Sequence, residues 1–273
     1  MPFSFIRAII TGMSERPFFS IITINYNNKD GLKKTIDSVA AQTFGGYEHI
    51  IIDGGSTDGS VDVIKVALQD KNYAAHLSYW QSEKDGGIYP AMNKGVEHAG
   101  GEYCLMLNSG DYLSSPDILA RVASFGFTED LVYCDAYFVR GRHCRRIRYP
   151  KKITACFFFL RGFCHQTTFI KTSLQKENLY STEYKIVSDS EFFMRVVLKK
   201  NCSARYLPIA LSYYDAQTGL SSAHADLQAK EYAALIDQYL PPRVYADVMS
   251  YYKRRYWPLL LMRKAKRALL SLF

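Results

Sequence analysis

Apolar residues in the first half of the chain occur in short unbroken runs, separated by segments with helical spacing. The runs at residues 19–25 and 49–52 are too apolar to alternate, so we expect two buried strands. Residues 77–80 and 103–107 are further expected strands, and residues 89–98 are an expected helix. Leu32, Ile36 and Val39 recur at helical spacing between the first two runs. Strands and helices joined by short loops predict an α/β fold with a mostly parallel central sheet flanked by helices.

The pattern loosens beyond residue 111, where shorter strands are expected at residues 131–134 and 138–140. A helix is expected at residues 189–198. The sequence contains no internal repeat and no low-complexity linker, so we expect the two halves to share one core. We therefore predict an amphipathic segment over residues 1–17, a domain over residues 18–225 and a basic helical tail over residues 226–273.

The C-terminal tail has an amphipathic pattern. Apolar residues fall on one helical face, namely Leu261, Ala265, Ala268, Leu269 and Leu272. Basic residues fall on the other face, namely Arg263, Lys264, Lys266 and Arg267. This pattern is typical of a helix that lies in a membrane interface. Packing on the surface of the protein itself, or on a second subunit in a homodimer, is the alternative.

The formal net charge is +8, and the basic residues concentrate at residues 140–152 and 253–267. Such clusters favour anionic lipid or phosphate, although a run like the first is usually just a solvated hairpin, with a grip on a lipid-linked or membrane-bound acceptor as the alternative. Six scattered cysteines with no CxxC pair indicate a reducing compartment. No secretory signal is recognisable, and no apolar run approaches the roughly 18 residues that span a bilayer. We expect a cytoplasmic protein, peripheral on the inner face of the cell membrane.

Four polar clusters directly follow expected strands. They are residues 23–27 (TINYN), 53–60 (DGGSTDGS), 83–87 (EKDGG) and 108–111 (NSGD). In open α/β sheets, ligands bind at the carboxyl ends of the strands. Carboxylates at several strand ends suit a nucleotide base, ribose hydroxyls and a hard cation such as Mg²⁺ or Mn²⁺, which also bridges diphosphate oxygens.

The order and spacing of six motifs resemble the family 2 nucleotide-sugar glycosyltransferases, which have the GT-A fold. The resemblance covers about residues 18–222. Four motifs lie in the first half: SIITINYNN (20–28), IIDGGSTDGS (51–60), SEKDGGIYPAMNKGV (82–96) and NSGDYL (108–113). FCHQTTFI (163–170) and VSDSEFFMR (187–195) are similar to motifs of the acceptor half. The resemblance therefore implies a GT-A-like domain with a nucleotide-binding half at residues 18–113 and an acceptor half at residues 114–225.

The resemblance also implies roles for individual residues. Thr23 and Tyr26 would flank the nucleotide base, Asp53 would bond to the base, and Asp85 would lie near the ribose or sugar. The donor site as a whole would comprise Thr23, Asn25, Tyr26, Asp53, Gly55, Asp85, Gly86, Asn93, Lys94 and Asn108. Asp111 would hold the divalent cation on the diphosphate, and Asp189 would be the general base.

Three of these signals have a second interpretation. Asp189 would also serve as the cap of the helix that it opens, and a cap is compatible with a base. His165 and Gln166 are either a structural pair or a contact to the acceptor or the diphosphate. Ser221, with Tyr214 and neighbouring residues, resembles a loop over the donor diphosphate, and a plain turn is equally consistent.

One motif departs from the family pattern. The family offers two or three carboxylates after this strand, whereas Asn108-Ser109-Gly110-Asp111 retains only Asp111. Fewer charged ligands predict weaker metal binding. A catalytically inactive sugar-nucleotide-binding protein of the same fold is therefore the alternative to an enzyme. Nucleic acid is excluded as a partner, because Asp53, Asp85 and Asp111 would repel its phosphates.

The expected reaction is an inverting transfer of a sugar from a nucleotide-diphosphate donor to a hydroxyl group. By resemblance, the nucleotide is UDP and the acceptor is a glycan or a lipid-linked molecule. The family and the basic tail together suggest assembly of bacterial surface polysaccharide or lipopolysaccharide.

Overall fold

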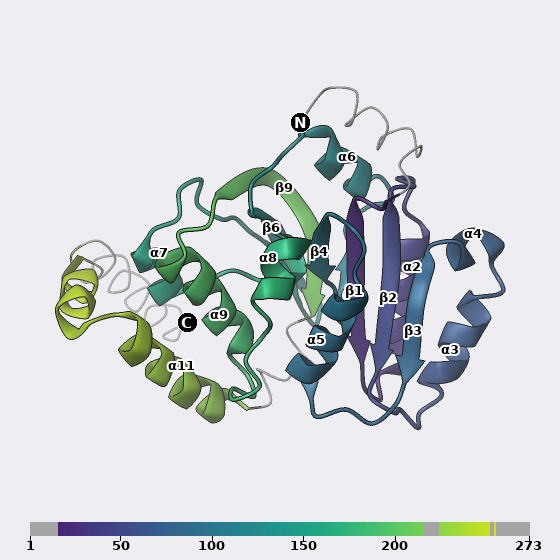
Figure 1. The fold of residues 1–273 in the computed structure, drawn as a ribbon, viewed down its shortest axis with the longest axis horizontal. Helices are drawn as coiled ribbons and strands as arrows, with labels where there is room; N and C mark the ends of the chain where they lie inside the picture. The colour runs from purple at the N-terminus through teal and green to yellow at the C-terminus, as the bar shows by residue number, and fades with distance from the viewer. Residues whose placement is uncertain (1–15, 216–223, 252–253, 255–273) are drawn as a thin grey trace, which may run out of the picture.

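The computed structural model describes residues 16–215, 224–251 and 254. A nine-stranded sheet lies at its centre, with helices on both faces (Figure 1). The strands follow the order β3 (Leu77–Ser82), β2 (Tyr47–Asp53), β1 (Phe19–Asn25), β4 (Tyr103–Met106), β8 (Thr168–Lys171), β6 (Leu131–Arg140), β9 (Ala204–Asp215) and β5 (Tyr112–Leu113). The ninth strand, β7 (His143–Ile147), pairs with β6.

The four strands expected in the first half form the parallel part of the sheet. β1 pairs in parallel with β2 and β4, and β2 pairs in parallel with β3. Every residue of β1 is buried, as the unbroken apolar run predicts for a strand covered on both faces. The carboxyl ends of β1, β2 and β4 therefore open toward the same edge, where three of the polar clusters follow.

Beyond β4 the sheet contains both parallel and antiparallel pairs, whereas the sequence pattern predicted a mostly parallel sheet. β8 runs antiparallel to both β4 and β6, and β5 runs antiparallel to β9. β9 is parallel to β6. The two short strands expected at residues 131–134 and 138–140 are one strand, β6, which continues through Asp135. Asp135 interrupts the apolar sequence pattern, but the backbone pairing of β6 with β9 continues past it.

The helices alternate with the strands in the first half and cluster beside the sheet in the second. They are α2 (Lys29–Ala40), α3 (Ser60–Ala67), α4 (Lys71–Ala74), α5 (Ile88–His98), α6 (Ile118–Ser124), α7 (Ala155–Leu160), α8 (Thr172–Glu177), α9 (Ser188–Met194) and α11 (Ala225–Tyr239), with a short 3₁₀ turn η1 (His165–Thr167). The helix expected at residues 189–198 is divided: α9 passes into a wider turn, η2 (Arg195–Lys199), with π-helical geometry.

Apolar side chains fill both faces of the sheet. From β1, Ile22 and Ile24 pack in one cluster with Met92 of α5. Ile21 points to the opposite face, where it joins a second cluster with Leu119 of α6. This alternation follows from the two-residue period of a strand. The sheet is thereby packed on both faces. The loops that follow the carboxyl ends of its strands therefore start from fixed positions.

The first part of the predicted tail packs against the domain. Leu235, Ile236 and Tyr239 of α11 are buried, and they belong to the same core cluster as Phe192 of α9. The amphipathic pattern from Leu259 onward, like the N-terminal pattern within residues 1–15, lies outside the described residues. Within the described part of the chain, no helix has the length and apolar character needed to cross a membrane.

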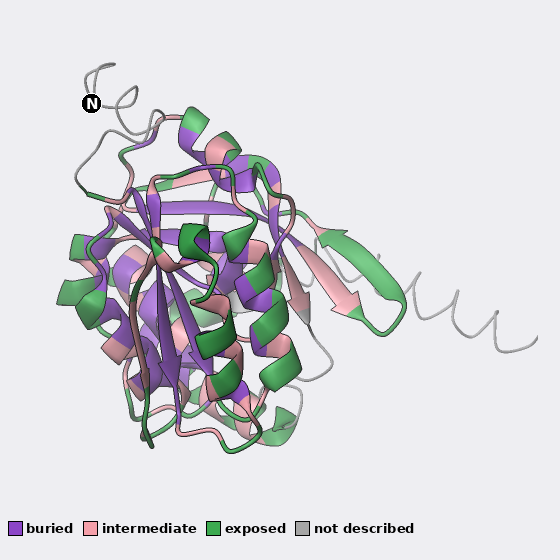
Figure 2. Ribbon diagram, turned by 90° about the vertical axis from the view of Figure 1, so that its right-hand side faces the viewer, coloured by how far each residue is buried: buried purple, intermediate pink, exposed green. Residues whose placement is uncertain are grey.

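The basic cluster at residues 140–152 lies largely on a projecting hairpin. β6 and β7 form its two strands, and Figure 2 shows its outer part as exposed. Arg146 is the residue that anchors it: the guanidinium forms an ion pair with the buried carboxylate of Asp135 at 2.8 Å. Arg140, Arg142, Arg145 and Arg148 are exposed.

Candidate active site

A cavity of about 790 Å³ lies at the carboxyl edge of the parallel strands. Its size is that of a pocket for a small-molecule ligand. The lining residues come from the carboxyl ends of β1, β2, β3 and β4, from the start of α5 and from segments of the second half. They are Ile24, Asn25, Tyr26, Asn27, Asn28, Gly54, Lys84, Asp85, Gly87, Ile88, Tyr89, Ala91, Met92, Asn108, Ser109, Asp111, His165, Gln166, Lys185, Ile186, Asp189 and Tyr214.

Asn25 lines this cavity and carries a buried hydrogen-bond acceptor. Its Nδ2 donates to Asp53 Oδ1 at 2.7 Å and to Ser56 Oγ at 3.2 Å. Asp53 is an acceptor, so the amide nitrogen must face it and the amide oxygen must face away. That oxygen, Oδ1, is buried and has no hydrogen-bond partner among the described residues. A buried acceptor in a cavity is suited to a ligand N–H or O–H group.

Asp53 itself does not line the cavity. Besides Asn25, its carboxylate accepts hydrogen bonds from the Ser56 amide at 2.9 Å, the Ser56 hydroxyl at 2.6 Å and the Ser82 hydroxyl at 2.5 Å. Burial acts to raise the pKa of this carboxyl, but the hydrogen bonds outweigh burial and hold the pKa below its usual value. Asp53 is therefore an ionised anchor for Asn25 and for the turn after β2.

Glycine at position 54 allows two cavity residues to approach the strand end. A Cβ atom at Gly54 would lie 3.1 Å from Asp85 Oδ2 and 3.2 Å from Tyr26 Cδ2. Tyr26 as a whole residue is 69% exposed, so a ligand can cover its side chain. Gly55 has a φ of +79°, a left-handed conformation that glycine adopts without strain. The turn after β2 thus brings a carboxylate and an aromatic ring to one wall.

Asn108 and Asp111 stand at the end of β4. Both line the cavity, and Asp111 is buried. The Oδ1 atom of Asn108 is also buried without a hydrogen-bond partner among the described residues. A carboxylate and a free amide oxygen are suitable ligands for Mg²⁺ or Mn²⁺ when diphosphate oxygens complete the shell. No cluster of three or more Asp, Glu, His or Cys side chains suited to a metal occurs within the described ranges.

Asp189 lies on α9 and is connected to Asn108 through His165. Nδ1 of His165 is 3.2 Å from Asp189 Oδ2, and Nε2 is 3.2 Å from Asn108 Nδ2. An amide nitrogen donates, so Nε2 accepts and the proton lies on Nδ1, which donates to Asp189. The amide of Ser190 donates to Asp189 Oδ1 at 2.8 Å. The carboxylate is therefore held in place, and Asp189 remains partly exposed to the cavity.

Tyr89, on α5 in the first half of the chain, contacts the Asp189 carboxylate. Its hydroxyl donates to the backbone oxygen of Ile186 at 2.6 Å and lies 3.3 Å from Asp189 Oδ1. Burial raises the pKa of Tyr89, so this hydroxyl keeps its proton. Tyr89, Lys84 and Lys185 line the cavity but were given no role by the sequence analysis. Tyr89 lies within one of the quoted motifs, whereas no local signal marks Lys185.

The structure brings together Asn25, Tyr26, Asp85, Asn108, Asp111, His165, Gln166 and Asp189 of the predicted site. It does not bring Thr23 to the cavity. The Thr23 hydroxyl is buried in the sheet, donating to the Leu107 carbonyl at 2.8 Å and lying 2.9 Å from His49 Nε2. Thr23 shares a face of β1 with Asn25 but lies two residues before the end of the strand, where it is enclosed between β2 and β4 and its hydroxyl bonds within the sheet.

Other predicted donor residues also lie outside the cavity lining. Asn93 exchanges two hydrogen bonds of 2.9 Å with the backbone of Tyr180, and Lys94 pairs with Glu83 at 2.8 Å on the surface. Gly55 and Gly86 shape the turns beside lining residues. Ser221 lies outside the described residues.

Comparisons with known proteins relate this chain to glycosyltransferases. Residues 20–200 match the family model of glycosyl transferase family 2. An uncharacterized glycosyltransferase of Mycobacterium tuberculosis is 36% identical over 207 residues, which cover 68% of this chain and 71% of the relative. A glycosyltransferase of PGL/p-HBAD biosynthesis from Mycobacterium bovis is 33% identical over 215 residues, covering 77% and 81%.

Solved structures share the fold at low sequence identity. Staphylococcus aureus TarS, residues 1–349 with UDP-GlcNAc, matches with a TM-score of 0.64 and 20% identity, over 88% of this chain and 72% of that one. The mannosyltransferase PcManGT of Pyrobaculum calidifontis, with GDP-Man and Mn²⁺, matches with a TM-score of 0.65 and 17% identity, over 95% and 82%. These likenesses establish the GT-A fold. With the family match across most of the chain, they lead to one identification: this protein is a glycosyltransferase and belongs to glycosyl transferase family 2.

Proposed function

We propose that this chain transfers a sugar from a nucleotide-diphosphate donor to an acceptor hydroxyl, with inversion at the anomeric carbon. One observation carries the proposal. A single cavity is lined by a fixed carboxylate, Asp189, and by the oxygen ligands Asn108 and Asp111. His165 joins Asp189 to Asn108 through its two ring nitrogens. A base and groups that stabilise the departing diphosphate are what a single displacement requires.

In the proposed reaction, Asp189 accepts the proton of the acceptor hydroxyl. The acceptor oxygen forms a bond to the anomeric carbon, while the bond between that carbon and the donor diphosphate breaks. The nucleoside diphosphate leaves on the opposite face with the electron pair. His165 donates to Oδ2 of Asp189 and so directs the remaining lone pairs of the carboxylate. General-base catalysis of this kind contributes about 10²- to 10⁴-fold.

A divalent cation, Mn²⁺ or Mg²⁺, would be held by Asp111 and by the free amide oxygen of Asn108. When bound, it neutralises charge that develops on the leaving diphosphate. Lys84 and Lys185 line the same cavity and supply further positive charge within the protein itself. A cation with one protein carboxylate depends on the diphosphate for further ligands, so metal and nucleotide are expected to bind together.

The unpaired Oδ1 of Asn25 would bind some nucleotide bases better than others, because it needs a hydrogen-bond donor. Uracil and guanine each present a ring N–H that this acceptor can receive, whereas cytosine has a lone pair at the corresponding ring nitrogen. Leaving the buried acceptor unpaired costs about 1–3 kcal/mol, or about 10- to 100-fold in affinity. We propose that Asn25, held by Asp53, reads the base, and on the family resemblance alone we propose UDP rather than GDP as the nucleotide.

Calorimetric titration with UDP, GDP and CDP, each with and without Mn²⁺, tests the proposed donor. We expect UDP to bind in the presence of Mn²⁺ and CDP to bind at least about tenfold more weakly. Replacement of Asn25 by alanine should remove the difference between UDP and CDP. If none of the nucleotides binds under any metal condition, the proposed transfer is wrong. Binding without any transfer to glycan acceptors would instead indicate an inactive sugar-nucleotide-binding protein.

We further propose that the acceptor belongs to surface polysaccharide or glycolipid assembly and is met at an anionic membrane. The glycosyltransferase of Mycobacterium bovis named above supports the first part by its assignment to PGL/p-HBAD biosynthesis. The β6–β7 hairpin supports the second. Phe138 of β6 pairs with Arg145 of β7 and with Tyr214 of β9, and Tyr214 lines the cavity. Paired residues share one face of a sheet, so exposed Arg145 lies on the same face as the cavity.

Vesicle sedimentation tests this membrane contact. The double variant Arg142→Glu/Arg145→Glu should lose binding to vesicles that contain anionic phosphatidylglycerol, since each basic residue near such a surface contributes about 1 kcal/mol. Lys65→Glu/Lys71→Glu is the control, because it makes the same charge change on α3 and α4, beside β3 (Figure 1). Equal binding by the two variants would contradict the proposed role of the hairpin.

A further inference from the structure

The carboxylate of Glu231, on α11, accepts hydrogen bonds from three consecutive backbone amides. Oε1 accepts from the amide of Lys185 at 2.9 Å, and Oε2 accepts from Ile186 at 2.9 Å and Val187 at 3.3 Å. These amides directly precede α9, the helix that carries Asp189. Ile186 and Val187 are buried, so their N–H groups need a partner within the protein. A side chain 44–46 residues away supplies it.

The segment held by Glu231 is also a wall of the cavity. Lys185 and Ile186 line it, and the Ile186 carbonyl accepts the hydrogen bond of the Tyr89 hydroxyl. Val187 begins α9 through its carbonyl, which accepts from the amide of Glu191 at 2.9 Å. The peptide groups of this segment are thus fixed from two sides, by Glu231 at the N–H groups and by Tyr89 at a carbonyl.

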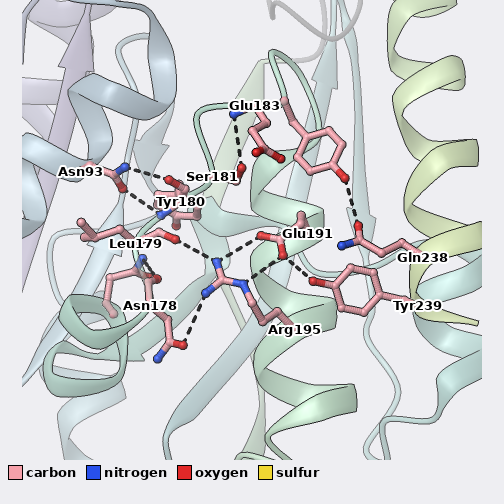
Figure 3. A network of polar contacts seen from close by, with 12 residues as sticks. Asn93, Asn178, Leu179, Tyr180, Ser181, Glu183, Glu191, Arg195, Gln238 and Tyr239 are labelled. Atoms are coloured by element: carbon pink, nitrogen blue, oxygen red, sulfur yellow. Dashed lines mark hydrogen bonds and ion pairs between the residues drawn. The ribbon is translucent and has the colours of Figure 1, made fainter.

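Other contacts place α11 firmly beside this segment (Figure 3). Glu191 of α9 receives the Tyr239 hydroxyl of α11 and forms an ion pair with Arg195 at 2.9 Å. Tyr184 donates to Gln238 of α11 at 3.0 Å. Arg195 also donates to the Leu179 carbonyl at 2.8 Å. The bonds of Tyr239 and Gln238 join α11 to α9 and to Tyr184, so the Glu231 carboxylate reaches the three amides from a defined position.

We infer that Glu231 is a positioning residue for the catalytic base: it holds residues 185–187 so that Asp189 and the adjoining cavity wall keep their geometry. The inference rests on the proposed function of Asp189. Glu231 does not line the cavity and touches no reacting atom. Its negative charge matters, because a carboxylate has lone pairs for three donors, whereas a neutral amide would turn N–H groups toward some of them.

Glu231→Gln tests this role, with Asp237→Asn as the matched control. Asp237 is exposed on the same helix, so its change removes the same charge. We expect Glu231→Gln to lower kcat for sugar transfer by about 10- to 100-fold, the effect of displacing a catalytic group by about 1 Å. The Kd for UDP should change much less than kcat, because Asn25, Asn108 and Asp111 are untouched and Lys185 is only one of two lysines that line the cavity in the described part of the chain. Glu231→Asp, which keeps the charge on a shorter side chain, should recover part of kcat.

Hydrogen exchange gives a readout that does not depend on activity. The amides of residues 185–187 should exchange at least about tenfold faster in Glu231→Gln than in Asp237→Asn. Unchanged exchange, or a kcat equal to that of Asp237→Asn, would overturn the inference. If the glutamine variant does not fold, hydrogen exchange in the wild-type protein tests the inference instead. Fast exchange of the amides of residues 185–187 in the wild-type protein would also overturn the inference. Faster exchange together with a wild-type protein that transfers no sugar would instead place the failure in the proposed function.

Discussion

Asp189→Asn is expected to lower kcat for sugar transfer by about 10²- to 10⁴-fold while leaving nucleotide binding and the unfolding temperature nearly unchanged. Asparagine has the same shape and can still accept from the Ser190 amide, but its neutral amide cannot take the proton of the acceptor hydroxyl. Steady-state transfer assays, titration with UDP and thermal unfolding together measure this separation of catalysis from binding and stability.

A matched change distinguishes loss of the base from loss of charge. Glu183→Gln removes one negative charge from an exposed side chain just before the segment that leads into α9. Its kcat should stay close to that of the wild-type protein, since surface substitutions of this kind have small effects. If Asp189→Asn retained full activity, Asp189 would be a structural residue that orders the start of α9, and another base would be needed.

Asp111→Asn is expected to weaken UDP binding in the presence of Mn²⁺ by about 10²-fold and to leave metal-free binding unchanged. Asp111 is the carboxylate of the Asn108–Asp111 turn, so its loss removes the charged protein ligand of the proposed cation. Each tenfold loss of affinity corresponds to about 1.4 kcal/mol. Titration with UDP at fixed Mn²⁺, and with Mn²⁺ at fixed UDP, measures both partners.

Asp62→Asn on α3 is the control for this change of charge, because Asp62 is exposed and distant in the sequence from the turn. Nucleotide binding that is equally strong with and without Mn²⁺ in the wild-type protein would contradict the metal role of Asp111. In that case Lys84 and Lys185 would supply the positive charge that binds the diphosphate.

Strand-end position made much of the site predictable. The apolar run of β1 defined a buried strand, and the polar residues after the parallel strands β1 to β4 therefore had to meet at one edge. Asn25, Tyr26, Asp85 and Asp111 do line the cavity. The second half was less predictable, because the reversal at β8 and the single long strand β6 depend on pairing between residues that are distant in the sequence.

Side-chain direction limited the prediction of individual roles. The resemblance assigned base contacts to Thr23 and Asp53, yet their side chains bond within the protein and leave Asn25 to face the cavity. Motif spacing gives the position of a residue along the chain but not how its hydrogen bonds are shared. Glu231 shows the same limit, because nothing in the local pattern of α11 indicates that one of its carboxylates holds a segment that precedes α9.

The bridge formed by His165 affects how the energetics of this site can be divided. One imidazole contacts both Asn108, which belongs to the same turn as the proposed metal ligand Asp111, and Asp189, the proposed base. Rotation of the ring to suit one neighbour alters its bond to the other. Residues in one hydrogen-bond network have coupled effects. Free energies measured from single substitutions at Asn108 and at Asp189 will therefore not sum to that of the combined change, and only a double-mutant cycle can measure the part that the two residues share through the ring.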